Sequence, residues 1–155
     1  MIGTVTNVPS LRLATSSDEA AIATLLTAAR LPLDGVHEAL PGFVVAEDGG
    51  HIVGVAGVEA CGSRGEHALL RSVAVDPAWR SKGLGRTLVS RAIALAEERG
   101  AKALYLLTTT GEGYFPSFGF SRTSREAVPD DVRATAEFQG ACPASATVMV
   151  RTSLP

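Results

Sequence analysis

The chain has 155 residues and a formal charge of −2 at pH 7, with 46% hydrophobic, 19% charged and 5% aromatic residues. This length predicts one domain, and the apolar content excludes a wholly disordered chain. The near-neutral charge and the scarcity of aromatic residues predict no nucleic-acid partner. No apolar run approaches the roughly 18–20 residues of a membrane helix, and the first residues lack a signal-peptide pattern. We therefore expect a soluble, cytoplasmic protein with no membrane partner.

The two cysteines, Cys61 and Cys142, are far apart in the sequence and belong to no Cys-x-x-Cys or Cys/His cluster. This count excludes a disulfide framework and predicts a reducing compartment, and the spacing predicts no metal site. Neither cysteine has a neighbouring base in the sequence. We therefore expect two small, buried thiols without a chemical role.

The elements begin with a loose leader at 1–10 and a strand at 11–13. Ser16 and Glu19 match a capping box that would open the first helix. The following predicted elements are a short helix within 33–40, strands at 43–46, 52–58 and 68–75, a helix at 84–99, a strand at 104–107, a short helix or turn at 111–119, a strand at 120–123, a helix at 129–138 and a strand at 147–151. This order predicts a mixed α/β domain over 11–152.

The most informative segment joins the apolar strand at 68–75 to the amphipathic helix at 84–99. Glycines at a helix start let an anion approach unpaired backbone N–H groups, where the helix dipole also favours negative charge. We therefore predict an anion site, best suited to a diphosphate, formed by Arg80, Ser81, Lys82, Gly83, Leu84, Gly85 and Arg86. A P-loop is excluded because Lys82 precedes both glycines, and no third glycine completes a Rossmann fingerprint. Taken alone, the motif also fits a plain helix start with surface cations.

The context of this loop carries a family resemblance. Arg80-x-x-Gly83-x-Gly85, after Val-Asp-Pro, resembles the acetyl-coenzyme A loop of the GCN5-related N-acetyltransferase (GNAT) family, and the run 114–120 resembles that family's second signature. The resemblance implies a mixed, mostly antiparallel sheet that is flanked by helices and splayed between two central parallel strands, at 69–75 and 103–109. It also implies acetyl-coenzyme A as co-substrate, with its arm contacted by Val73, Ala74, Val75 and Phe115. Many relatives are dimers, so a homodimer is an open expectation.

Four segments are similar to the arsenic-resistance N-acetyltransferases and, in part, to the acetyltransferase domain of N-acetylglutamate synthases. These segments are 69–75, 105–110, 135–138 and 142–146. The resemblance implies acetylation of the α-amine of a small amino acid, such as arsinothricin, phosphinothricin or glutamate. Acetylation of another amine (a polyamine, an aminoglycoside or a lysine) and a non-catalytic acyl-coenzyme A sensor are the alternatives.

Candidate acceptor contacts follow from both arguments. Arg71 lies inside an apolar strand, so it either clamps a substrate carboxylate or pairs with an acid such as Glu59. Thr108 and Thr109 end a strand at the presumed gap, although threonine is also an ordinary strand residue. The resemblance adds Arg133 and Ser145 as candidates for the acceptor's carboxylates; Arg133 is equally a solvated helix residue.

Acetyl transfer to an ammonium group needs a base, and the departing thiolate can use an acid. Candidate bases are Glu59, Glu66 and His67, and a water chain could replace any of them. The family usually has tyrosine where this chain has Phe115, which cannot donate a proton. Either the adjacent Tyr114 takes that role or the thiolate leaves unprotonated.

Overall fold

The computed structural model describes residues 8–152, so most of the leader predicted at 1–10 lies outside the described residues. Seven strands form one sheet in the order β1-β2-β3-β4-β5-β7-β6 within this part of the chain. The strands are β1 (Ser10–Leu13), β2 (Phe43–Asp48), β3 (His51–Cys61), β4 (His67–Val75), β5 (Ala103–Thr108), β6 (Ser121–Thr123) and β7 (Thr147–Thr152). Only β4 and β5 pair in parallel, which confirms the mixed, mostly antiparallel sheet.

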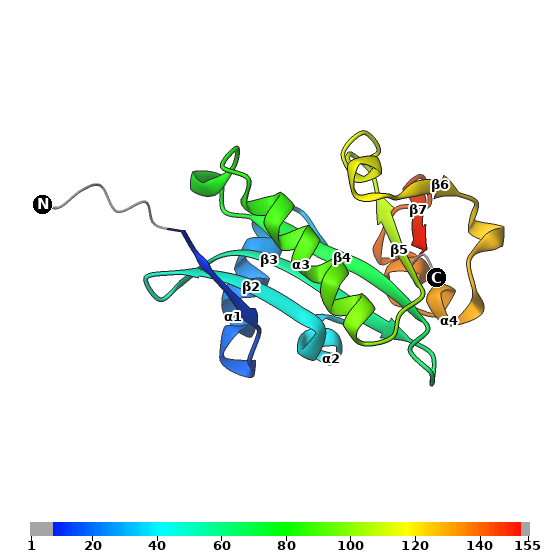
Figure 1. Ribbon diagram of the computed structural model, residues 1–155, viewed down its shortest axis with the longest axis horizontal. Coiled ribbons are helices and arrows are strands. Elements are labelled where there is room, and N and C mark those ends of the chain that lie inside the picture. The colour runs from blue at the N-terminus through cyan, green and yellow to red at the C-terminus, as the bar shows by residue number, and fades with distance from the viewer. Residues whose placement is uncertain (1–7, 153–155) are drawn as a thin grey trace, which may run out of the picture.

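The helices cover both faces of this sheet (Figure 1). They are α1 (Glu19–Ala28), α2 (Val36–Ala39), α3 (Leu84–Glu98) and α4 (Asp130–Arg133). The apolar stripe of α3, with Leu88 and Ala92 fully buried, packs on one face of β2, β3 and β4. The stripe of α1, with Ile22 and Leu26 fully buried, packs with α2 on the opposite face. The side chains of the central strands thus alternate between the core beneath α3 and the core beneath α1, and Cys61 and Leu69 belong to a third core with Val132 of α4.

The start of the first helix differs from its prediction by one residue. Thr15, not Ser16, precedes the first turn, and its N–H donates to the Asp18 carboxylate at 2.7 Å. A short 3-10 turn over Ser16–Asp18 then leads into α1. Asp18 also receives two N–H groups from the Arg12 guanidinium, at 2.8 and 2.9 Å. This ion pair with Arg12 of β1 holds the Asp18 side chain inward. Asp18, rather than the predicted Glu19, therefore completes the capping box.

The predicted helix at 129–138 is broken in the structure. It consists of α4 and a separate helical turn at Glu137–Ala141. The Thr135 hydroxyl donates to the Val132 carbonyl at 2.7 Å, a local bond that competes with continuation of the helix. The break turns Glu137 inward, and its side chain becomes buried.

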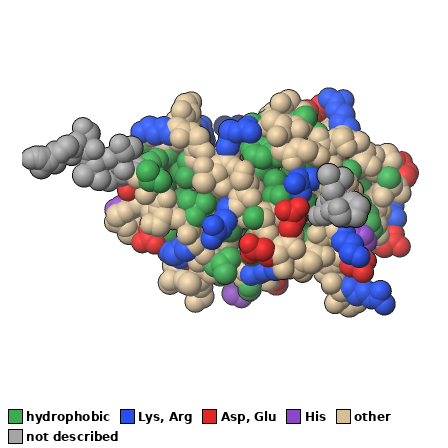
Figure 2. All heavy atoms as spheres, viewed as in Figure 1, with side chains coloured by type: hydrophobic (Ala, Val, Ile, Leu, Met, Phe, Trp, Pro, Cys, Tyr) green, Lys and Arg blue, Asp and Glu red, His purple; other side chains and the backbone are tan. Residues whose placement is uncertain are grey.

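The sheet opens between β4 and β5, as the family resemblance implies. The two strands pair only at His67–Leu69 with Ala103–Tyr105 and then diverge, as Figure 1 shows. Beyond Leu69, β4 stays paired with β3 and β5 stays paired with β7, so the edges of β4 and β5 that face each other lose their pairing. Acidic and basic side chains are interspersed over the face drawn in Figure 2, with no large patch of one sign among the residues coloured there. No helix within 8–152 has the length and apolarity needed to cross a membrane.

Candidate functional site

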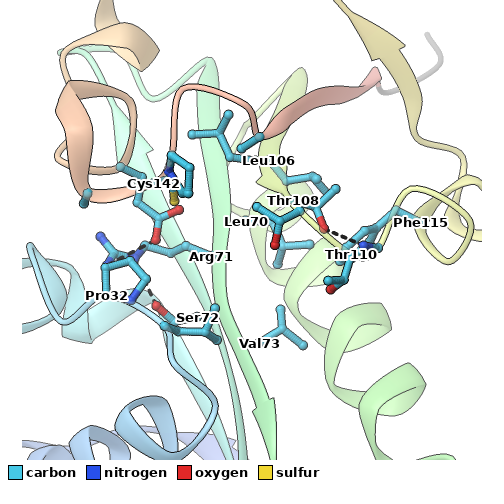
Figure 3. Close-up of a pocket in the computed structure, with 18 of the residues that line it drawn as sticks. Pro32, Leu70, Arg71, Ser72, Val73, Leu106, Thr108, Thr110, Phe115 and Cys142 are labelled. Atoms are coloured by element: carbon cyan, nitrogen blue, oxygen red, sulfur yellow. Dashed lines mark hydrogen bonds and ion pairs between the residues drawn. The ribbon is translucent and has the colours of Figure 1, made fainter.

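The gap between β4 and β5 contains a cavity of about 480 Å³ (Figure 3). Its walls come from five stretches, at 30–32, 70–73, 106–111, 114–115 and between 137 and 146. In Figure 3, Arg71, Ser72, Pro32 and Cys142 lie on one side, and Leu106, Thr108, Thr110 and Phe115 lie on the other. The cavity therefore has a polar, charged side and a largely apolar side, across which a small molecule could be oriented.

A β-bulge shapes the β4 wall of the cavity. Gly57 of β3 pairs with Arg71 and Val55 pairs with Ala74, so two residues of β4 stand opposite one of β3. Ser72 has φ 59°, a left-handed conformation that a non-glycine residue rarely adopts. Beyond Leu69, the edge of β4 that faces β5 has no sheet partner among the described residues. Its backbone groups are therefore available to an extended ligand.

Arg71 points to the polar side, but protein groups already engage its guanidinium. Its Nη1 donates to Glu59 at 3.0 Å, Nε to the Ser72 hydroxyl at 3.0 Å and Nη2 to the Asp34 carbonyl at 2.6 Å. The side chain is fully buried. The structural pairing of Arg71 with Glu59 is thus present, and the predicted carboxylate clamp would have to displace one of these partners.

Glu137 is a cavity residue that the sequence arguments did not single out. Its carboxylate lies 3.5 Å from Arg71 Nη2 and is 5% exposed. Burial raises its pKa, and the positive charge of Arg71 acts in the opposite direction. The Cys142 thiol shares a hydrogen bond with Glu137, and burial together with this carboxylate raises the thiol's pKa to about 12. Cys142 is therefore a protonated, weakly reactive thiol at neutral pH.

The apolar side has one organised hydroxyl. Thr108 Oγ1 accepts the Gly111 N–H at 2.7 Å, which leaves the hydroxyl hydrogen free to be donated elsewhere. A Cβ on Gly111 would meet Thr108 Oγ1 at 2.8 Å and the Phe115 ring at 2.7 Å. Only glycine permits this close approach. Phe115 packs edge-on against buried Phe120, which fixes the ring at the inner end of the cavity.

The predicted anion loop forms a second, smaller cavity of about 360 Å³. Its lining residues are Val75, Trp79, Arg80, Ser81, Gly83, Gly85, Arg86 and Tyr114. Ser81 (φ 64°) and Gly83 (φ 82°) both adopt left-handed conformations immediately before α3, and no Cβ clash would occur at Gly83. Two cations that line this cavity, Arg80 and Arg86, therefore lie at the N-terminal end of a 15-residue helix.

Tyr114 lines both cavities and so connects them. Its phenol oxygen lies 3.6 Å from the point that a Cβ on Gly85 would occupy, at the start of α3. The Arg86 guanidinium stacks on Phe118, 4.4 Å from the ring centroid, and donates to the Ser117 hydroxyl at 3.1 Å. Burial raises the pKa of the Tyr114 phenol. The phenol oxygen thus lies near the start of α3.

Several predicted site residues do not line either cavity. His67 lies at the start of β4, where its Nδ1 is 3.0 Å from Asp131. Glu59 pairs with Arg71, which lines the cavity, but Glu59 itself does not line it. The Glu66 backbone carbonyl accepts a hydrogen bond from the Lys102 N–H. Arg133 pairs with Asp130, and Ser145 is exposed. Ala74 is buried in the core beneath α1 and Leu84 in the core beneath α3. Lys82 lies over the Trp79 ring, 5.2 Å from its centroid.

Arg30 is a cavity residue that no motif indicated. It is exposed, follows α1 and adopts φ 60° without being glycine. Within residues 8–152 it takes part in no ion pair. It is therefore an uncompensated cation at the edge of the cavity. Among the described residues, no group of three or more His, Cys, Asp or Glu side chains could hold a metal ion.

The model of the "Acetyltransferase (GNAT) family" matches residues 11–120. An uncharacterized N-acetyltransferase of Chlorobaculum tepidum is 29% identical over 100 residues, which span 64% of this chain and 63% of that protein. The chain therefore spans less than two thirds of this relative.

Two solved structures share the fold. N-acetylglutamate synthase from Neisseria gonorrhoeae, complexed with coenzyme A and N-acetyl-glutamate, superposes with a TM-score of 0.80 and 23% identity over 97% of this chain and 36% of that chain. Rv2747 from Mycobacterium tuberculosis, in complex with CoA and NLQ, superposes with a TM-score of 0.79 and 25% identity over 94% of this chain and 100% of that chain.

Proposed function

Because the chain belongs to the GNAT acetyltransferase family, we propose that it transfers an acetyl group from acetyl-coenzyme A to the α-amine of a small amino acid. The observation that carries this proposal is the continuity of three features. The anion loop, the unpaired edge of β4 and the cavity between β4 and β5 adjoin one another, with Tyr114 common to both cavities. A molecule with a diphosphate at one end and a thioester at the other matches that sequence of environments.

The fit to coenzyme A follows from the residues of each part. Backbone N–H groups before α3, with Arg80 and Arg86, suit the diphosphate. The edge of β4 at Val73 and Val75 suits the amide-containing arm, which would add to the sheet as a strand does. The thioester would then lie between Val73 and Thr108, which both line the larger cavity. There the Thr108 hydroxyl, with its hydrogen free, would donate to the developing thiolate.

The acceptor is proposed to be an amino acid that carries an anionic group, such as glutamate, arsinothricin or phosphinothricin. Arg30 supports this class, because it is the cation on the cavity edge that no described acid neutralises. The four segments similar to the arsenic-resistance enzymes also support it. The Neisseria gonorrhoeae structure binds N-acetyl-glutamate, but its 23% identity supports only the shared fold.

One observation favours a second candidate acceptor. Arg71 has Glu59 as its closer ion-pair partner, so the Glu137 carboxylate on the polar side of the cavity is not fully neutralised by the guanidinium. A cationic amine, such as a polyamine, would be attracted there. A non-catalytic sensor of acyl-coenzyme A is supported by Phe115, which occupies the position of the usual tyrosine.

The release of free thiol from acetyl-coenzyme A tests these alternatives together. The protein is assayed against glutamate, arsinothricin, phosphinothricin, two polyamines, an aminoglycoside and a lysine peptide. We expect the anionic amino acids to give the highest kcat/KM. A preference for polyamines would establish the second candidate instead. Coenzyme A binding without turnover across the panel would support the sensor.

A further inference from the structure

One carboxylate lines the cavity. Of the described residues that form its walls, Glu137 alone is acidic, and none is histidine. The other ionisable groups that can lose a proton are Cys142 and Tyr114, and burial raises the pKa of each. Neither is therefore an effective base near neutral pH. None of the three bases expected from the sequence, which are Glu59, Glu66 and His67, lines the cavity.

The ion pairs of Arg71 distinguish Glu137 from Glu59. Glu59 makes the shorter contact, 3.0 Å from Nη1, and Glu137 stands 3.5 Å from Nη2. Nη2 itself donates to the Asp34 carbonyl at 2.6 Å. The guanidinium thus has its charge partner in Glu59. Glu137 is held in place without being fully neutralised, and it faces the cavity that Glu59 does not reach.

We propose that Glu137 binds the ammonium group of the acceptor and removes its proton. This inference rests on the proposed function and names the base of that same reaction. Glu137 lies beside Arg71 and Cys142, and Figure 3 shows these two residues across the cavity from Thr108. This position sets the amine between the base and the thioester.

The ammonium transfers one proton to the Glu137 carboxylate and becomes a neutral amine. The nitrogen lone pair forms the C–N bond to the thioester carbonyl carbon, and the C–S bond breaks with its electron pair leaving on sulfur. The second nitrogen proton then neutralises the thiolate, so the products are the amide and the free thiol. Glu137 returns its proton to water, which restores the carboxylate.

The surroundings of Glu137 suit a base. Four groups face it from the packed elements: Arg71 on β4, Glu59 on β3, Asp34 between α1 and α2, and the Cys142 thiol. Burial and the two acids raise the pKa of Glu137, whereas Arg71 and the thiol lower it. The balance is a raised pKa, which makes the carboxylate a stronger proton acceptor than one in water.

A glutamine at this position tests the proposal. E137Q keeps the shape and can still hydrogen-bond, but it cannot accept the proton. We expect kcat/KM for the acceptor to fall by about 10²–10⁴-fold, as for other general bases, with coenzyme A affinity within about twofold of wild type. The deficit should shrink for acceptors of low amine pKa and at high pH, because these supply the neutral amine without help.

E59Q is the matched control, because it removes the shorter ion pair of the same guanidinium. A purely structural carboxylate would make E59Q at least as damaging as E137Q, with parallel pH profiles. That result, or an E137Q activity within about threefold of wild type, overturns the proposal. Should E137Q not fold, E137A serves as the second variant, with formate added to supply the missing carboxylate. We expect formate to restore part of the lost activity, and E137A activity within about threefold of wild type contradicts the proposal. If wild type itself releases no thiol with any amine, the proposed function fails instead.

Discussion

The Arg71 guanidinium and the Glu59 carboxylate form a 3.0 Å ion pair in which the arginine side chain is entirely buried. Removing one partner of a buried pair leaves the other charge uncompensated, at a cost of about 3–5 kcal/mol. We therefore expect R71A to be strongly destabilised in urea unfolding, because Glu59 and Glu137 would then repel each other. An R71A protein of nearly wild-type stability with only a raised acceptor KM would instead support a carboxylate clamp.

Arg30 gives a variant that tests acceptor recognition without threatening the fold. R30G removes the charge and places glycine where the backbone already has φ 60°. The melting temperature should not fall, because the left-handed conformation costs a non-glycine residue roughly 1–2 kcal/mol. We expect the KM of an anionic amino acid to rise about threefold to tenfold, whereas R30K keeps the wild-type value. An unchanged KM for anionic acceptors in R30G would remove Arg30 from the site.

The Thr108–Gly111 hydrogen bond leads to a prediction about the thiolate. T108V removes the hydroxyl that accepts the Gly111 N–H and that is free to donate into the cavity. We expect kcat to fall about 10–100-fold, the range for losing a hydrogen bond to a charged group, while T108S retains most of the activity. The measurement is thiol release at saturating substrates. Activity that is lost in T108S but retained in T108V would indicate that the methyl group, not the hydroxyl, matters.

Asp18 makes stability depend on pH in a defined direction. The Arg12 guanidinium lowers the pKa of Asp18 from 3.8 to about 2, so its contribution is complete above pH 3.8 and is lost as the pH falls through about 2. We expect D18N to lower the unfolding free energy by about 1–2 kcal/mol at pH 7. The difference from wild type should narrow between pH 4 and pH 2 in urea titrations. A difference that is constant over this range would assign the effect to packing.

The parts of the site that depend on local order were predictable from the sequence. The segment from Arg80 to Arg86 has its glycines, cations and helix start in one contiguous run, and the structure forms a cavity there. The divergence of β4 from β5 followed from the family resemblance. These features depend on backbone conformation near the named residues, which short motifs encode well.

The remaining site residues depend on tertiary packing. Glu137 enters the cavity because α4 ends early, and Arg30 because the segment after α1 turns toward β4. Neither event has a periodic pattern in the sequence. Tyr114 and Phe115 are neighbours, yet one faces the start of α3 and the other packs against Phe120. The start of the first helix likewise depends on a contact outside the helix, because Arg12 of β1 pairs with Asp18 and holds it in place.

The central claim is that the loop before α3 binds the diphosphate of coenzyme A, and glycine-to-alanine variants test it most directly. G83A and G50A each place a Cβ on a left-handed backbone (φ 82° and 86°) with open space around it, so their strain should be alike. G50A, in the β2–β3 turn, is therefore the control for stability. Calorimetric titration of coenzyme A should show wild-type affinity for G50A and an affinity at least tenfold weaker for G83A. Equal affinities in all three proteins, or no binding to wild type, would contradict the account.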